Sequence, residues 1–189
     1  MPEDIFSSKI ASSQINYWQP LGTLYVAAVL QKAGHEVKFF NGAFITHEEI
    51  LRQVIQFKPE FIGLYSTTFG WQKAIQTASD IRQVLKNSYT KNPPLSPFVK
   101  GGLHKSLNSQ KVTPEIPPLE KGGMGGFEDI FITAGGPYPI AMQEHCLEDA
   151  GQCIDAIVTG EGEYTVLEIV ERLQSGESLD GVQGVIFRK

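Results

Sequence analysis

Short apolar runs alternate along this sequence with longer runs of helical spacing, and this alternation limits the folds open to the chain. The predicted strands, in order, are 35–40, 60–66, 129–136, 155–160 and a last one within 184–189. The predicted helices are 20–34, 46–58, 71–87 and 164–176. The first is apolar almost all round and should be buried. The second opens with a capping box in which Thr46 caps and Glu49 reaches back, the third has an apolar stripe, and the last should stop at Gly176. Strands separated by helices of this length indicate βαβ units, so we expect an α/β fold with a doubly wound, mostly parallel sheet.

The number of these units suits one flavodoxin-like (Rossmann-like) domain over residues 1–189. Two segments depart from the pattern. Residues 88–128 have no periodicity, are rich in Pro, Gly, Ser and Lys, and contain a near-repeat (PPLSPFVKGG and PPLEKGGMGGF), so we predict a low-complexity, disordered insertion. The segment MPEDIFSSKI is a poor strand, so the first strand with which such a sheet normally begins is not predicted.

Composition excludes several classes of partner. The net charge is -5 and no cluster of Lys and Arg occurs, which argues against nucleic acid. No apolar run approaches the roughly 18 residues that a membrane span needs, and the N-terminus has no apolar core typical of a signal peptide. With only Cys146 and Cys153, a disulfide framework is not expected, and we predict a cytoplasmic protein.

Loops at the carboxyl ends of the predicted strands are the candidate ligand site, because open parallel sheets bind ligands there. Glycines and small hydroxyl residues dominate three of the four loops, which favours a large, neutral ligand bearing amides or hydroxyls. The alternative is structural, since tight βα turns often contain Gly, and Ser and Thr often cap helices. The candidate residues are Tyr17, Trp18, Gln19, Pro20, Leu21, Gly22, Ser66, Thr67, Thr68, Gly135, Gly136, Pro137, Gly160, Glu161, Gly162 and Glu163.

Glu161 and Glu163 are the only charged residues among these candidates. A general acid–base pair needs a substrate between its carboxylates and usually one perturbed pKa. No His, Lys or other carboxylate in the remaining loops completes such a site, and a hard metal ion would need more oxygen ligands. We therefore expect these glutamates to favour the start of the next helix or to orient a ligand, and we predict no catalytic residue.

Metal and nucleotide motifs are absent from the sequence. Its histidines have no metal-ligand spacing; they are His35, His47, His104 and His145. Cys146 and Cys153 have no third cysteine, so no iron–sulfur cluster is expected in this chain. Neither a nucleophile elbow nor a dinucleotide GxGxxG occurs.

Several stretches, in this order, resemble one known family: YWQPLGTLYVAAVLQKAGHEVKFFNG, KPEFIGLYSTTFGWQKAIQTASDIR, ITAGGPYP, DAIVTGEGEYTVLEIVERL and GVQGVIFR. Together they are similar to the cobalamin-binding domain that precedes the catalytic barrel of cobalamin-dependent radical S-adenosylmethionine (SAM) enzymes. The resemblance covers about residues 17–87 and 129–188. It implies a flavodoxin-like fold that holds cobalamin across the strand ends, in contact with the candidate residues given above.

The chain also departs from that family. The Asp-x-His-x-x-Gly motif that supplies a histidine to cobalt in many other cobalamin proteins is absent, as it commonly is in the resembling family, which implies cobalt without a protein histidine below it. The CxxxCxxC motif of the catalytic barrel is absent too. The resemblance thus implies a cobalamin-binding module that is not catalytic alone and works with a separate or lost radical SAM domain. Two alternatives stay open: a small flavodoxin-like enzyme using Glu161 and Glu163, and an inert truncated fragment.

Overall fold

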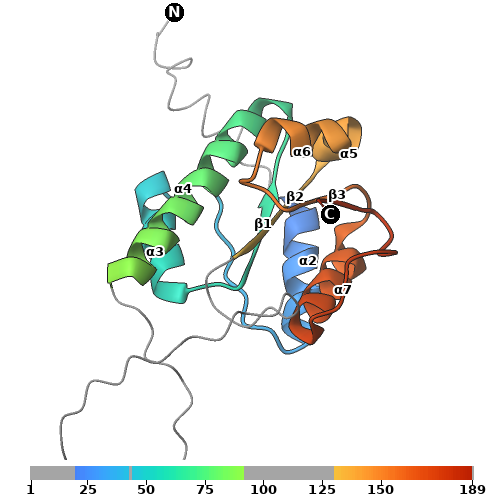
Figure 1. Ribbon diagram of the computed structural model, residues 1–189, viewed down its shortest axis with the longest axis horizontal. Coiled ribbons are helices and arrows are strands. Elements are labelled where there is room, and N and C mark those ends of the chain that lie inside the picture. The colour runs from blue at the N-terminus through green and yellow to red at the C-terminus, as the bar shows by residue number, and fades with distance from the viewer. Residues whose placement is uncertain (1–19, 43, 92–129, 189) are drawn as a thin grey trace, which may run out of the picture.

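A computed structural model describes residues 20–42, 44–91 and 130–188 of the chain (Figure 1). Its elements, in order, are α2 (Leu21–Lys32), α3 (His47–Phe57), β1 (Phe61–Tyr65), η2 (Thr68–Gly70), α4 (Trp71–Lys91), β2 (Phe131–Gly135), α5 (Pro137–Met142), α6 (Glu144–Ala150), β3 (Ala156–Val158), α7 (Gly162–Ser175) and β4 (Val185–Phe187). No helix in these ranges is long and apolar enough to cross a membrane.

The strands form one four-stranded sheet in the order β1-β2-β3-β4. β1 and β2 are parallel, and so are β2 and β3, whereas β4 runs antiparallel to β3. Leu64 pairs with Ala134, and Ala134 pairs with Ile157, so the three parallel strands are in register at their centres. The predicted α/β fold with a mostly parallel sheet is confirmed.

Helices cover both faces of this sheet, and each face has its own apolar cluster. Figure 1 shows α3 and α4 on one side of the strands and α2 and α7 on the other. On the α4 side, Ala78, Ile81 and Leu85 come from one stripe of the helix and pack with Ile132. On the α7 side, Val166, Ile169 and Val170 pack with Leu30 of α2.

Helix boundaries follow the signals in the sequence. The Thr46 side chain caps α3 by accepting a hydrogen bond from the Glu49 amide at 3.3 Å, and α7 ends at Gly176, which has φ +69°. The prediction that the Glu49 carboxylate reaches back to complete the capping box is wrong. The Glu49 carboxylate bonds Arg52 and Gln53 instead of reaching back, because those stronger partners lie one turn further along the helix.

Two predictions about the segment 20–40 are wrong. Residues 35–40 form no strand, because a strand needs a hydrogen-bonded neighbour and no described strand lies beside them. The helix at 20–34 forms but is not buried all round: Leu21 and Tyr25 are 63% and 62% exposed, since α2 packs mainly against α7. Only Leu30 of this helix is buried.

The two irregular segments of the sequence fall largely outside the described residues. No strand precedes α2 within the described ranges, and residues 1–19, where a first strand would lie, are not described. α4 continues to Lys91, so residues 88–91 of the predicted insertion belong to this helix, and 92–129 are not described. The chain returns at Ile130, beside the amino end of β2.

The amino end of the sheet is held by one arginine. Arg82 of α4 donates hydrogen bonds to the carbonyls of Cys153 and Ile130 at 3.0 and 3.2 Å, and to the Asp155 carboxylate at 2.5 Å. The same carboxylate oxygen accepts the Ile132 amide at 2.7 Å. Arg82 thereby joins α4 to the points where β2 and β3 begin.

Candidate functional site

Three loops meet at the carboxyl end of the sheet because β1, β2 and β3 are parallel neighbours. They follow Tyr65, Gly135 and Val158 and lead into η2 and α4, α5, and α7, respectively. Gly162, the first residue of α7, lies against Val26 of α2: a Cβ added to it would be 3.3 Å from Val26 Cγ2. Val26 lies one turn after Gly22 along α2, and Figure 1 shows α2 and α7 side by side, so the first turn of α2 borders the same rim.

The loop after β1 contains one buried and two exposed hydroxyl residues. Ser66 is 2% exposed; its amide donates to the Gly135 carbonyl at 2.9 Å and its hydroxyl donates to the Thr67 carbonyl at 3.0 Å. The amide bond ties the ends of β1 and β2 together, and the hydroxyl is bonded within its own loop, so Ser66 contributes to the structure of the rim. Thr67 and Thr68 are exposed at the rim.

Gly136 is required by the backbone. Its φ is +103°, and a Cβ there would be 2.7 Å from the Ser66 carbonyl oxygen and 3.0 Å from the Tyr65 ring. Gly135 is less constrained, because an added Cβ would make ordinary contact with Val158 at 3.6 Å. Pro137, at the first position of α5, is exposed, and proline is favoured at such a position.

Gly22 and Gly160 differ from these glycines because nothing described in the fold requires them. Both are exposed, an added Cβ would meet no atom within 4 Å, and neither has a positive φ. Gly22 lies in the first turn of α2, where glycine is about 0.5–1 kcal/mol less favourable than alanine. Two uncrowded glycines at one rim indicate a surface kept free of side chains.

The two glutamates of the rim lie at the start of α7, as predicted. Glu161 is the N-cap residue, yet its side chain makes no capping hydrogen bond; it is exposed, and Glu163 is half-buried. An open groove of about 550 Å³ runs along α7 and is lined by Glu168, Glu171, Arg172, Gln174, Ser175 and Glu177. Neither rim glutamate lines it.

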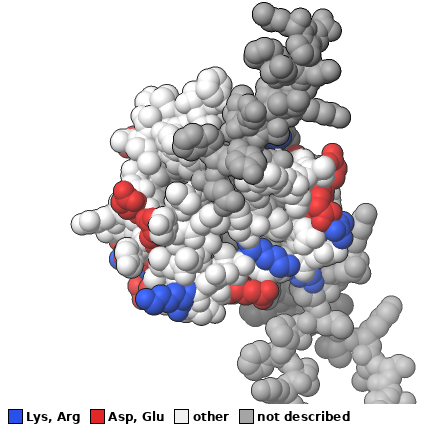
Figure 2. All heavy atoms as spheres, turned by 180° about the vertical axis from the view of Figure 1, so that it is seen from behind, with Lys and Arg blue, Asp and Glu red and all other residues white. Residues whose placement is uncertain are grey.

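Large apolar side chains are exposed around the same rim. Phe69 is 101% exposed and Tyr164 is 79% exposed, and Leu21 and Ile140 are exposed beside them in the chain segments that form the rim. Figure 2 shows few charged atoms over the upper part of the face it draws, where the described residues are mostly uncharged. A rim of this composition suits a large ligand with apolar edges better than a small anion.

Trp71 is a candidate that the sequence reasoning missed. It begins α4 directly after the rim loop, is 2% exposed, and packs against Tyr138 with ring centroids 5.5 Å apart. Its Nε1–H is buried without a hydrogen-bond partner, which is uncommon because such a group costs about 1–3 kcal/mol. The only sequence signal was its position, three residues after Thr68.

No group of His, Cys, Asp or Glu suited to a metal ion occurs within the described ranges. His47 Nε2 lies 2.8 Å from the Asp80 carboxylate, and His145 Nδ1 lies 3.2 Å from the Met142 carbonyl. Burial, followed by the nearby Asp149 carboxylate, raises the pKa of the Cys146 thiol to about 11. Tyr17, Trp18 and Gln19 lie outside the described residues.

The chain resembles known proteins in sequence. The family described as the B12 binding domain matches residues 9–116, more than half of the chain. An uncharacterized methyltransferase of Pyrococcus horikoshii, PH0819, is 26% identical over 172 residues, which cover 90% of this chain and 28% of the relative. The cytidylyl-2-hydroxyethylphosphonate methyltransferase of Streptomyces wedmorensis is 27% identical over an alignment of 189 positions. The alignment covers 89% of this chain and 27% of the relative.

A solved structure has a similar fold. It is the radical S-adenosylmethionine methyltransferase TsrM from Kitasatospora setae, with tryptophan substrate and the SAM analog aza-SAM bound. The TM-score is 0.61 at 14% sequence identity, and the match covers 91% of this chain and 26% of that chain. The chain thus spans little more than a quarter of the length of the relatives it matches.

Proposed function

The chain belongs to the B12-binding domain family, and on that premise we propose that it binds cobalamin across the carboxyl-end rim of its sheet. It resembles the corresponding part of cobalamin-dependent radical SAM methyltransferases, as the sequence indicated. The observation that carries the proposed site is the pair of open glycines, Gly22 and Gly160, because they leave room for a ligand that the fold itself does not fill.

The residues present at the rim fit a large, mainly uncharged cofactor. Gly22 and Gly160 allow a ring system to approach the backbone of α2 and of the loop after β3. The exposed hydroxyls of Thr67 and Thr68 can bond amide groups at the cofactor's edge. The buried Nε1–H of Trp71 is a donor that an oxygen of the cofactor can satisfy if the rim opens locally.

The other predicted contact residues contribute to the shape or polarity of the rim in this proposal, and Ser66 does so by joining the ends of β1 and β2. Gly135, Gly136 and Pro137 shape the β2 end of the rim, and Gly162 seats α7 against α2. Glu161 and Glu163 orient polar groups of the cofactor or favour the helix start. Pro20 and Leu21 would border it from the α2 side, and Tyr17, Trp18 and Gln19, outside the described residues, stay contacts predicted from the sequence. Bound cobalamin supplies a cobalt ion for group transfer, and the chain's part is to bind and orient it.

We further propose that the chain has no catalytic activity alone and meets a radical SAM domain supplied elsewhere. The length of its relatives supports this, since each extends well beyond the matched region. We propose that the iron–sulfur cluster of such an enzyme belongs to that other domain, because Cys146 is buried in the apolar core and pairs with no second cysteine. A cytoplasmic setting without nucleic-acid partners stays our prediction, supported by the free cysteines and the net charge of -5.

The rival enzyme, which would use Glu161 and Glu163, is not favoured. It requires an enclosed pocket around the carboxylates, and Glu161 is exposed outside the groove along α7. The inert-fragment alternative is opposed by two well-buried apolar clusters within the described residues.

A visible absorption spectrum tests the proposal. The purified chain is incubated with hydroxocobalamin, desalted, and scanned; we expect stoichiometric retained colour. Gly160→Leu should abolish the retention, because its side chain enters the space left open at the rim. The matched control is Gln152→Leu, an exposed position in the loop that enters β3 at the opposite end of the sheet, and it should retain cobalamin. A cooperatively unfolding wild-type chain without colour contradicts the proposal.

A further inference from the structure

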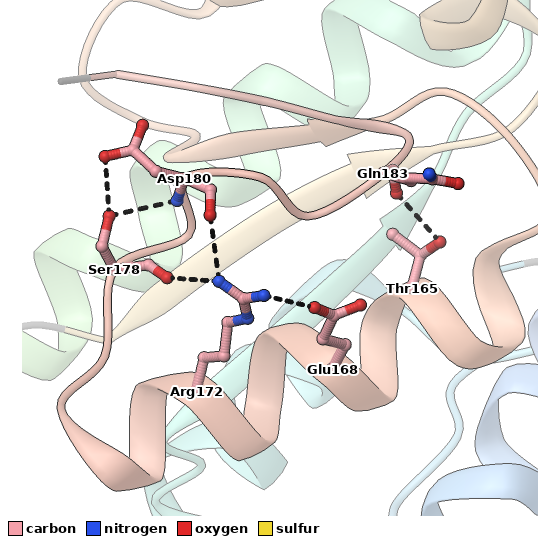
Figure 3. Close-up of polar contacts among 6 residues, drawn as sticks. All are labelled: Thr165, Glu168, Arg172, Ser178, Asp180 and Gln183. Carbon is pink, nitrogen blue, oxygen red and sulfur yellow. Dashed lines mark hydrogen bonds and ion pairs between the residues drawn. The ribbon is translucent and has the colours of Figure 1, made fainter.

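The segment between α7 and β4, residues 176–184, is held along α7 by one arginine; we name it the return loop. Arg172 Nη1 donates to the carbonyls of Ser178 and Asp180 at 2.9 and 3.0 Å. Its Nη2 donates to the Glu168 carboxylate at 2.7 Å, one helical turn earlier. Figure 3 shows the guanidinium lying between the loop and the helix, so this side chain joins the two.

The loop is also internally ordered. The Ser178 hydroxyl donates to the Asp180 carboxylate at 2.9 Å and accepts the Asp180 amide at 3.0 Å. Leu179 and Val182 are 5% and 6% exposed and anchor the loop in the apolar cluster under α7. The return loop is therefore a fixed structure and not a loose connection.

The end of the return loop that precedes β4 contacts the rim loop after β3. The Gly184 carbonyl accepts the Thr159 amide at 2.8 Å, directly before Gly160. The Thr165 hydroxyl donates to the Glu161 carbonyl at 3.2 Å and lies 3.4 Å from the Gln183 carbonyl, which links the rim to the loop (Figure 3). A Cβ added to Gly184 would be 3.8 Å from Thr165 Oγ1 and 3.9 Å from the Gly160 nitrogen.

Arg172 itself is too far from the rim to touch a ligand there. It lies ten residues after Gly162 along α7, which corresponds to about 15 Å of helix. Its bonds to the Ser178 and Asp180 carbonyls give Arg172 a connection to the rim through the return loop. Thr165 connects the two more directly, since it lies two turns before Arg172 on the same face of the helix.

We propose that the return loop sets the conformation of the rim loop Thr159–Glu161, with Arg172 and Thr165 as positioning residues for ligand binding. This inference rests on the proposed function for its ligand, cobalamin. Holding the rim loop in its binding conformation before the ligand arrives avoids an ordering cost on binding. The loop would thus contribute to affinity without contacting the cofactor.

Affinity for hydroxocobalamin, measured in the full chain well below the melting temperature, is the first test. We expect Arg172→Met and Thr165→Val to weaken binding by about tenfold, and Thr165→Ser, which keeps the hydroxyl, to restore it. The matched controls are Arg52→Met, which removes an arginine bonded only within α3, and Thr77→Val on α4. A substitution that lowers only the global stability leaves nearly all molecules folded at this temperature. Its dissociation constant is therefore unchanged, so weaker binding reports on the rim loop.

Amide hydrogen exchange without any ligand is the second test. In Arg172→Met, exchange at Thr159 should accelerate relative to Arg52→Met, while amides in the centre of β2 keep the wild-type rate. Unchanged exchange at Thr159, or cobalamin affinity in Arg172→Met and Thr165→Val equal to that of the controls, would overturn the inference. A wild-type chain that binds no cobalamin refutes the proposed function, and exchange then decides alone whether the loop positions the rim.

Discussion

Gly22 offers a test in which stability and binding should change in opposite directions. Gly22 lies in the first turn of α2, has no positive φ, and an added Cβ meets nothing within 4 Å. Alanine removes the conformational freedom of glycine in the unfolded chain, so Gly22→Ala should raise the free energy of unfolding by about 0.5–1 kcal/mol. For a chain of this size, each kcal/mol of added stability raises the melting temperature by roughly 2–4 °C.

Binding should respond the other way. A side chain at position 22 occupies the space that we assign to the cofactor, so Gly22→Leu should weaken hydroxocobalamin binding by about tenfold or more, and Gly22→Ala less. Urea denaturation gives the change in stability, and titration followed by visible absorption gives the dissociation constant.

Gly34, at the other end of the same helix, is the matched control. Its φ is +97°, so Gly34→Ala should lower stability by about 1–2 kcal/mol through strain alone, with nothing within 4 Å to clash. It should leave affinity unchanged, because it lies at the end of α2 away from the rim. The reasoning is refuted if Gly22→Leu binds cobalamin as tightly as wild type, or if Gly22→Ala is destabilising.

Three further outcomes are expected. Arg82→Met should lower the free energy of unfolding by about 2–3 kcal/mol in urea denaturation, because it removes the donor to two carbonyls and leaves the Asp155 carboxylate with the Ile132 amide but no cation. A thiol reagent at pH 8 should modify half-buried Cys153 in the native protein and spare Cys146, whose burial raises its pKa to about 11; rapid native modification of both would contradict this. Bonds from Arg52 and Gln53 hold the pKa of Glu49 at about 2. The difference in free energy of unfolding between wild type and Glu49→Gln should therefore be present above about pH 4.5 and be lost as the pH falls toward 2. A difference independent of pH would count against this.

Elements with strong local signals could be predicted from the sequence. The apolar stripe of α4, the Thr46 cap of α3 and the Gly176 stop of α7 each depend on neighbours within a few residues, and each was found. The three parallel strands are apolar runs between such helices, so they could be recognised as well.

Features that depend on distant partners could not be read in this way. Residues 35–40 have a strand-like composition, but composition cannot supply the neighbouring strand that pairing requires. The candidate glycines look alike in sequence, and only the fold separates Gly136, which the backbone needs, from Gly22 and Gly160, which it does not. The unpaired indole of Trp71 likewise has no signature in the sequence.

The positions of Lys91 and Ile130 have a practical consequence. The chain leaves the described fold at the end of α4 and returns just before β2, at the amino end of the sheet, opposite the rim. Arg82 secures the point of return through the Ile130 carbonyl. An affinity handle or a whole reporter protein inserted between these two residues would therefore be attached on the side facing away from the proposed ligand site. The junction is a suitable point at which to immobilise the protein on a sensor surface with its rim turned toward the solution.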